Sequence, residues 1–156
     1  MKIMVINGPN LNMLGVREPD IYGRETYNDL MRYIKKSAAE LGVAVDVRQS
    51  NHEGEIVTWI QECLGAADAI VINSAAYTHT SVAILDALKA VNLPAVEVHL
   101  SEVNAREEFR RVSYSAMACQ KVIAGHGFAG YRMAMEEILD IRRQMLDLPQ
   151  SPKSNI

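Results

Sequence analysis

The sequence predicts an α/β fold, a three-layer sandwich in which a five-stranded parallel sheet carries helices on both faces. Three observations lead to this prediction. Five short apolar runs recur along the chain, stretches with helical periodicity separate them, and the length of 156 residues suits one domain. Strict alternation of strand and helix builds right-handed βαβ units, and such units give a parallel sheet that is covered on both sides.

The five apolar runs are the expected strands, at residues 3–6, 44–47, 69–72, 95–98 and 122–124. Four of them are nearly continuous, which is typical of strands buried on both faces. The apolar faces of the expected helices lie at residues 27–41, 59–64, 82–88 and 131–145. Gly42 is well placed to end the first of these helices, and a further helix is expected to start near Ala105. We therefore expect one flavodoxin-like domain over residues 1–148 and an irregular C-terminal tail over residues 149–156.

Composition limits the classes of function. The chain has 49% hydrophobic and 22% charged residues and a net charge of -3, so it offers no basic surface for nucleic acid or an anionic membrane. The four consecutive apolar residues before Asn7 are too few for a signal peptide or a membrane span, and we expect a cytoplasmic protein. Cys63 and Cys119 lack the spacing of metal ligands and are expected to be small buried hydrophobes.

Ligands of open parallel sheets bind at the carboxyl ends of the strands, and the residues there exclude several chemistries. No glycine-rich phosphate loop follows the first strand, and Asn7 and Asn73 carry amides where a phosphoacceptor domain needs carboxylates. The four histidines do not have the spacing of metal ligands. No lysine stands at these ends, so covalent imine chemistry lacks a nucleophile. What remains is noncovalent acid and base chemistry without a metal.

The segment VEVHLS carries the first candidate residues. Glu97 and His99 are two apart on a strand and project to the same face, where a carboxylate can orient an imidazole and raise its basicity. His99 is therefore a candidate general acid. The backbone N–H groups of Leu100 and Ser101, together with the Ser101 hydroxyl, are placed to receive a carboxylate. Solvated residues at a strand end and a simple turn are the alternatives.

Further polar candidates lie in the neighbouring segments. Arg106 and Arg110 stand four residues apart on the helix expected near Ala105, where Arg106 could equally belong to a solvated face. We expect Arg110 to face an anionic or polyhydroxylated ligand. Asn73 and His79 are interpreted as hydrogen-bonding partners of substrate hydroxyls, whereas the hydroxyl residues around His79 could simply cap the next helix.

The loop after the first strand, NGPNLNMLGVREPDIYG, is long for a connection of this kind, and long loops are often functional. It carries Arg17 and Tyr22. A neighbouring cation favours the phenolate, so Tyr22 is a candidate general base and the loop a candidate lid. The alternative is a charged surface loop that Tyr22 anchors.

These segments resemble the successive signatures of the type II 3-dehydroquinate dehydratases. The matching stretches run in the family's order from Asn7 to Phe109, and the last strand and helix are similar as well, so that the resemblance covers all but the tail. The stretches are NGPNLNMLGVREPDIYG, QSNHEG, YTHTSVAILDA, VEVHLS, AREEF and VIAGHGFAGYRMA. The sequence departs from the family pattern at NSAA, which replaces an Asn-Pro-Gly type of turn, at Leu85 and at Asn104.

The resemblance implies a lyase that dehydrates 3-dehydroquinate to 3-dehydroshikimate by anti elimination through an enolate, without metal or cofactor. In the family this reaction belongs to the shikimate pathway, which supplies chorismate and the aromatic amino acids. It also implies a homo-oligomer, a dodecamer built of trimers. Tyr22 matches the family's base, assisted by Arg17, and His99 matches the general acid, paired with Glu97. Asn10 matches the residue that holds a water against the enolate oxygen.

The remaining matches are substrate-binding positions. In the family, residues matching Asn73, His79 and Arg110 bind ring hydroxyls, those matching Leu100 and Ser101 bind the carboxylate, and one matching Arg106 lines the site. Asp86 matches a residue that reaches a neighbouring subunit's site, although an ion pair with Lys89 is an alternative from the residues alone. Two other functions stay open: the same reaction in quinate catabolism, and a noncatalytic flavodoxin-like binding module.

Overall fold

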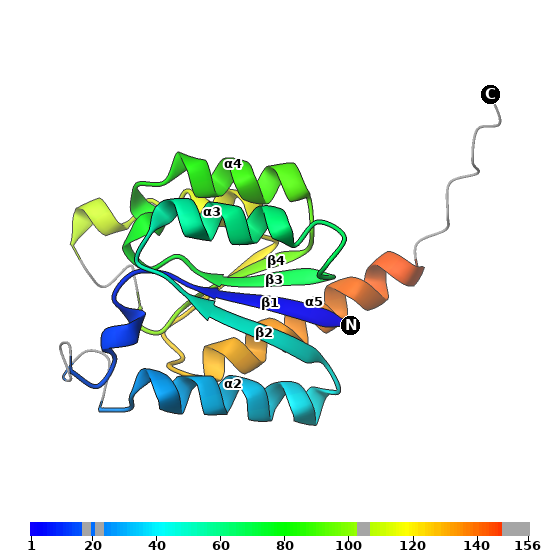
Figure 1. The fold of residues 1–156 in the computed structure, drawn as a ribbon, viewed down its shortest axis with the longest axis horizontal. Coiled ribbons are helices and arrows are strands. Elements are labelled where there is room, and N and C mark those ends of the chain that lie inside the picture. The colour runs from blue at the N-terminus through cyan, green and yellow to red at the C-terminus, as the bar shows by residue number, and fades with distance from the viewer. Residues whose placement is uncertain (17–19, 21–23, 103–106, 148–156) are drawn as a thin grey trace.

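A computed structural model of the chain describes residues 1–16, 20, 24–102 and 107–147 (Figure 1). Five parallel strands form one sheet in the order β2-β1-β3-β4-β5. The strands are β1 Lys2–Asn7, β2 Ala44–Gln49, β3 Ala69–Asn73, β4 Ala95–His99 and β5 Lys121–Ala124. This order places a topological switch point between β1 and β3, and it confirms the predicted fold class.

Helices cover both faces of the sheet, as predicted. In Figure 1, α3 and α4 lie on one face and α2 and α5 on the other. The helices are α2 Tyr27–Leu41, α3 Glu53–Glu62, α4 Val82–Val91 and α5 Ala129–Asp147. Short 3-10 turns lie between them: η1 Leu11–Met13, η2 Ala75–His79, η4 Glu108–Arg110 and η5 Ser115–Ala118. In the part of the chain that the structure describes, no helix combines the length and apolar character needed to cross a membrane.

The helix ends follow local rules of capping. Thr26 and Asp29 form a capping box at the start of α2, and Gly42 ends that helix with a left-handed φ of 69°. Ser81 caps α4, because its hydroxyl accepts from the backbone N–H of Ile84 at 3.0 Å. The predicted end at Gly42 is therefore confirmed, and Ser81 has the capping role that stood as the alternative for the hydroxyl residues near His79.

Successive residues of the central strands alternate between two cores. In β1, Ile3 and Val5 pack with α2 and α5, whereas Met4 and Ile6 pack with α3 and α4. The same alternation continues to the carboxyl ends of the strands. By this alternation, the side chains of Asn7 and Asn73 project to the face of the sheet that α2 and α5 cover. The side chain of Glu97 projects to the face that α3 and α4 cover. The polar residues at this edge of the sheet therefore divide into two groups.

Two expectations about the elements were wrong. The continuous apolar run at residues 122–124 does not form a strand buried on both faces, because β5 lies at an edge of the sheet and Val122 is 44% exposed. The helix expected near Ala105 is also absent from the described residues after the gap, where Glu107 is extended and Glu108–Arg110 form a 3-10 turn. That segment has too few apolar residues for an amphipathic helix, and its Phe109 is 68% exposed.

Two loops cross in direct contact at the carboxyl edge. The N–H of Gly8 donates to the carbonyl of Asn73 at 2.7 Å, and a Cβ at Gly8 would lie 2.6 Å from the carbonyl oxygen of Ser74. Only glycine fits this crossing. Ala75, in the unusual NSAA turn, has a left-handed φ of 49°. A conformation of that kind favours glycine, which the Asn-Pro-Gly turn of the resembled family would supply.

Candidate active site

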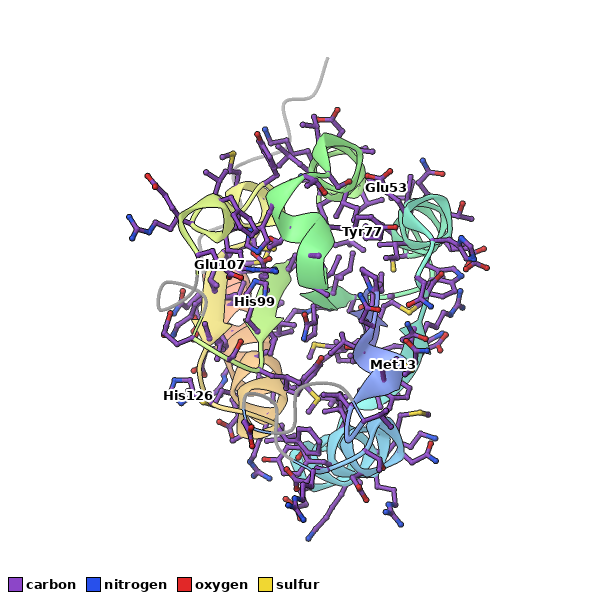
Figure 2. The ribbon with its side chains drawn as sticks, turned by 90° about the vertical axis from the view of Figure 1, so that its left-hand side faces the viewer. Met13, Glu53, Tyr77, His99, Glu107 and His126 are labelled. Atoms are coloured by element: carbon purple, nitrogen blue, oxygen red, sulfur yellow. The ribbon has the colours of Figure 1, made fainter. Side chains whose placement is uncertain are left out.

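Polar side chains from separate segments gather at the carboxyl ends of the strands. Figure 2 looks onto this edge: His99 at the end of β4 lies between Glu107 on one side and η1, which carries Met13, on the other. Tyr77 of η2 lies above this region in the same view, and His126 follows β5. This is the edge at which open parallel sheets bind their ligands, so we describe it as the candidate active site.

Glu97 and His99 form a buried, hydrogen-bonded pair. The Nε2–H of His99 donates to Oε1 of Glu97 at 2.9 Å, and the two residues are 8% and 0% exposed. With Nε2 held in this way, Nδ1 is the imidazole nitrogen that can act on a ligand, and it has no hydrogen-bond partner among the described residues. The structure therefore brings this carboxylate and this imidazole into contact at the end of β4, where the sequence predicts the pair.

Three hydroxyl groups surround the same carboxylate. Thr78 and Ser115 donate to Oε1 of Glu97 at 2.5 and 2.9 Å, and Ser113 donates to Oε2 at 2.9 Å. Thr78 belongs to η2, and the two serines lie before and at the start of η5. These contacts were missed from the sequence, where Thr78 counted only as a possible helix cap. The signal that was available is a glutamate in a strand with no arginine or lysine nearby, since a buried carboxylate requires donors.

The environment of Glu97 keeps it ionised. Burial raises the pKa of its carboxyl, but the hydrogen bond and charge of His99 and the hydroxyls of Thr78 and Ser115 together lower that pKa below its ordinary value. The thiol of Cys119 is affected in the opposite sense, because burial and the charge of Glu97 raise its pKa to about 12. Cys119 therefore stays neutral, and like Cys63 it is a free cysteine.

Two backbone N–H groups follow His99. Those of Leu100 and Ser101 donate to no other group within the described residues, while the carbonyls of His99 and Leu100 accept from Gly125 and Gly127 at 3.2 and 3.0 Å. The peptide groups are thus fixed by the loop after β5, and their N–H groups are left available. Such a pair can bind an anion such as a carboxylate by donating hydrogen bonds to its oxygens.

His79 and Arg110 approach the site from η2 and η4. The Nδ1–H of His79 donates to the carbonyl of Val112 at 2.6 Å, which leaves Nε2 for a ligand. The guanidinium of Arg110 lies 5.1 Å from the ring centre of Phe109, and its Nε donates to Glu107 at 2.8 Å. Its side chain is 19% exposed, so this cation is held largely within the protein surface rather than in solvent.

Asn73 lies in a buried network on the other side of the sheet. Its Nδ2 donates to the phenol oxygen of Tyr131 at 3.0 Å, its Oδ1 accepts from the N–H of Ala75 at 3.1 Å, and Tyr131 donates to Oδ1 of Asn7 at 2.6 Å. Burial raises the pKa of the Tyr131 phenol more than the hydrogen bond from Asn73 lowers it, so Tyr131 stays protonated and can donate. The network ties together the ends of β1 and β3 and orients the Asn73 amide.

We expect Tyr131→Phe to lower the free energy of unfolding by about 1–3 kcal/mol, because it removes the donor to Asn7 and the acceptor for Asn73 while keeping the buried ring. Urea denaturation would measure the loss. Tyr33→Phe is a matched control on α2, since no hydrogen bond of its hydroxyl is found within the described residues, and its effect should stay within about 0.5 kcal/mol. Equal effects in the two variants would contradict the role of the network.

Asn10 and Asp86 occupy two different settings. Asn10 has a left-handed φ of 68°, its backbone N–H donates to Oδ1 of Asn51 at 3.0 Å, and its exposed side chain makes no cap hydrogen bond. Its amide is therefore held at the edge by the backbone and available to a ligand or water. Asp86 is exposed on α4, one turn beyond Val82, and in the described part of the chain it forms no ion pair with Lys89.

Three predicted site residues, Arg17, Tyr22 and Arg106, lie outside the described residues. Of the others, the structure brings Glu97, His99, Leu100 and Ser101 together at the end of β4, whereas Asp86 is exposed on α4. Among the described residues, no group of three or more His, Cys, Asp or Glu side chains is arranged to hold a metal ion.

Comparisons with known proteins identify relatives that span most of the chain. The family model of class II dehydroquinases matches residues 1–139. The chain is 53% identical to a 3-dehydroquinate dehydratase of Clostridium acetobutylicum over 135 residues, covering 86% of this chain and 94% of the relative. It is 54% identical to a 3-dehydroquinate dehydratase of Phenylobacterium zucineum, covering 90% and 97%. The crystal structure of a type II dehydroquinase from Butyrivibrio crossotus superposes with a TM-score of 0.87 at 49% identity, over 89% of this chain and 97% of that one.

Proposed function

This chain belongs to the class II dehydroquinase family, and from that premise we propose that it removes water from 3-dehydroquinate to give 3-dehydroshikimate, as a step of the shikimate pathway. The observation that carries the proposal is the buried pair of Glu97 and His99 beside the two available N–H groups of Leu100 and Ser101. This arrangement places a general acid next to a binding position for a carboxylate. The substrate 3-dehydroquinate carries its leaving hydroxyl on the carbon that bears the carboxylate, so one binding mode serves both groups.

The reaction has two proton transfers. A base removes a proton from the carbon between the ketone and the carbon that bears the hydroxyl, and the electrons move onto the ketone oxygen as an enolate. The enolate then expels the hydroxyl, which takes a proton from Nδ1 of His99 and leaves as water. Asn10, with its available amide, would hold the water that stabilises the enolate oxygen. No metal or cofactor enters these steps.

Tyr22 is proposed as the base, with Arg17 favouring its phenolate. Three other tyrosines of the chain are less suited to this role. Burial raises the pKa of Tyr27 and of Tyr131, the wrong direction for a base, and the hydroxyl of Tyr77 donates to the carbonyl of Asn51 at 2.8 Å. In the family resemblance, Tyr22 is the residue that matches the base.

Ring hydroxyls of the substrate are proposed to bind Asn73, His79 and Arg110. His79 has Nε2 available, and the Asn73 amide is fixed by Tyr131 with one donor position unused. Arg106 is proposed to line the same site. These residues come from the ends of two strands, β3 and β4, and from the loops beyond them, so only the folded sheet brings them to one ligand.

We also propose a homo-oligomer, a dodecamer built of trimers, in the cytoplasm. Val82, Val112 and Met117 are 50%, 48% and 62% exposed in the single chain; Val82 belongs to α4, Met117 to η5, which packs against α4, and Val112 lies in the segment before η5. A surface of this kind suits contact with a second copy, and the exposed Asp86 lies on the same helix as Val82, so it could reach the site of a neighbouring subunit. Sedimentation velocity of the wild type and of Met117→Glu would test the proposed oligomer, and a monomeric wild type would contradict it.

The proposed reaction can be tested directly by mixing the protein with 3-dehydroquinate and following the ultraviolet absorbance of the conjugated enone product. We expect steady growth of absorbance at a rate proportional to protein concentration. The protein should be shown to be folded by circular dichroism in the same buffer. No growth with folded protein would contradict the dehydratase and favour a noncatalytic binding module.

A further inference from the structure

We propose that Thr78, Ser113 and Ser115 are positioning residues, which hold Glu97 as a carboxylate and thereby keep the proton that it shares with His99 on the imidazole. We call these three hydroxyl residues the hydroxyl cradle. This inference rests on the proposed function of His99 as a general acid, and it assigns a role to side chains that the family resemblance leaves without one.

The first step concerns charge. Glu97 is 0% exposed, and among the described residues His99 is the only one in contact with it that can carry a positive charge. The other titratable group close to it is the neutral thiol of Cys119. A buried carboxylate without donors is strongly disfavoured and would take up a proton instead. The cradle therefore supplies, from neutral hydroxyls, the stabilisation that an arginine or lysine would supply elsewhere.

The second step concerns the orientation of the hydroxyl protons. Thr78 lies 2.6 Å from the Ser113 oxygen and 2.8 Å from the Ser115 oxygen, so its proton could point to a serine instead of to Glu97. An ionised carboxylate favours the arrangement in which all three protons point at Glu97, because charge-assisted hydrogen bonds are about twice as strong as neutral ones. The Ser74 hydroxyl then donates to Ser115 at 3.2 Å and fills the acceptor position left open.

The third step connects the cradle to acid catalysis. If Glu97 took the proton from Nε2 of His99, the pair would become a neutral carboxylic acid beside a neutral imidazole. A neutral imidazole is a far weaker acid at Nδ1 than an imidazolium, so it could not protonate the departing hydroxyl. By favouring the carboxylate, the cradle favours the imidazolium, and the acid form of His99 is retained.

The cradle also links two loops of the site. Thr78 comes from η2, which carries His79, and the serines follow η4, which carries Arg110. The backbone N–H of Tyr114 donates to the carbonyl of Thr78 at 2.7 Å, and that of Ala116 donates to the Ser113 hydroxyl at 3.1 Å. The hydroxyls are therefore held in place by backbone contacts and do not depend on a bound ligand.

The test is a titration of the Glu97 carboxyl by carbon NMR of protein labelled with glutamate enriched at the carboxyl carbon. The Glu97 signal is identified by its loss in Glu97→Gln. We expect it to titrate below the ordinary glutamate range in the wild type, and about one pH unit or more higher in Thr78→Val and in Ser115→Ala. Thr80→Val is the matched control, an exposed threonine at the end of η2 whose change should leave the Glu97 titration within about 0.2 units.

Steady-state kinetics provide a second measurement on the same variants. At a pH where the wild type is fully active, kcat for 3-dehydroquinate should fall in Thr78→Val and in Ser115→Ala, because the pair of neutral imidazole and neutral carboxylic acid gains population, with KM changed little. The proposal would be overturned if the pKa of Glu97 were unchanged in folded Thr78→Val and Ser115→Ala. If Thr78→Val does not fold, Ser113→Ala replaces it as the second test variant. The NMR titration needs no turnover, whereas failure of the proposed function would appear as an inactive wild type.

Discussion

Replacing His99 with asparagine is expected to lower kcat for the dehydration of 3-dehydroquinate by about 10²–10⁴-fold, the usual worth of a positioned general acid. The departing hydroxyl would then have no proton donor at the end of β4. KM should change little, because the carboxylate would still bind to the N–H groups of Leu100 and Ser101. Initial rates of enone formation across substrate concentration would separate the two effects.

His52→Asn is the matched control for this experiment. His52 is an exposed residue at the start of α3, where its side chain makes no cap hydrogen bond and asparagine is a favourable residue. Its kcat should match that of the wild type. If the two variants lost activity equally, or if His99→Asn lost activity only in step with loss of folded protein, His99 would not be the acid.

The architecture was predictable because each element is specified locally. Continuous apolar runs separate buried strands from amphipathic helices, and Thr26, Gly42 and Ser81 fix helix ends through short-range hydrogen bonds and backbone conformation. The position of a strand within the sheet is not local. The exposure of Val122 depends on β5 being an edge strand, and nothing within that apolar run distinguishes an edge from a centre.

The candidate site was predictable only in part. Glu97 and His99 follow from the two-residue repeat of a strand, since both side chains must project to one face. Their hydroxyl partners come from segments 16 to 19 residues away, and no periodicity joins such positions. Tyr131 was counted as part of the apolar face of its helix, which is true of its ring. Its hydroxyl contacts Asn7, 124 residues away, and only the folded chain brings the two together.

Replacing Tyr22 with phenylalanine is the second change with a large expected effect, a fall in kcat of about 10²–10⁴-fold, because it removes only the group that accepts the proton. The dissociation constant of an unreactive cyclic carboxylate, measured by calorimetry, should stay within about threefold of the wild type, since Leu100, Ser101 and Arg110 are untouched. Tyr33→Phe is the control, because it makes the same chemical change on α2, and its kcat should be that of the wild type.

The comparison of binding with turnover decides what Tyr22 does. A phenolate that acts only on the reacting carbon contributes to the transition state and not to the affinity of the ground state, so its removal lowers kcat without weakening the ligand. A side chain that merely anchors the loop of residues 7–23 would weaken ligand binding and rate together. Equal losses in Tyr22→Phe would therefore assign Tyr22 to the structure of the loop, and the base would have to be sought in another residue.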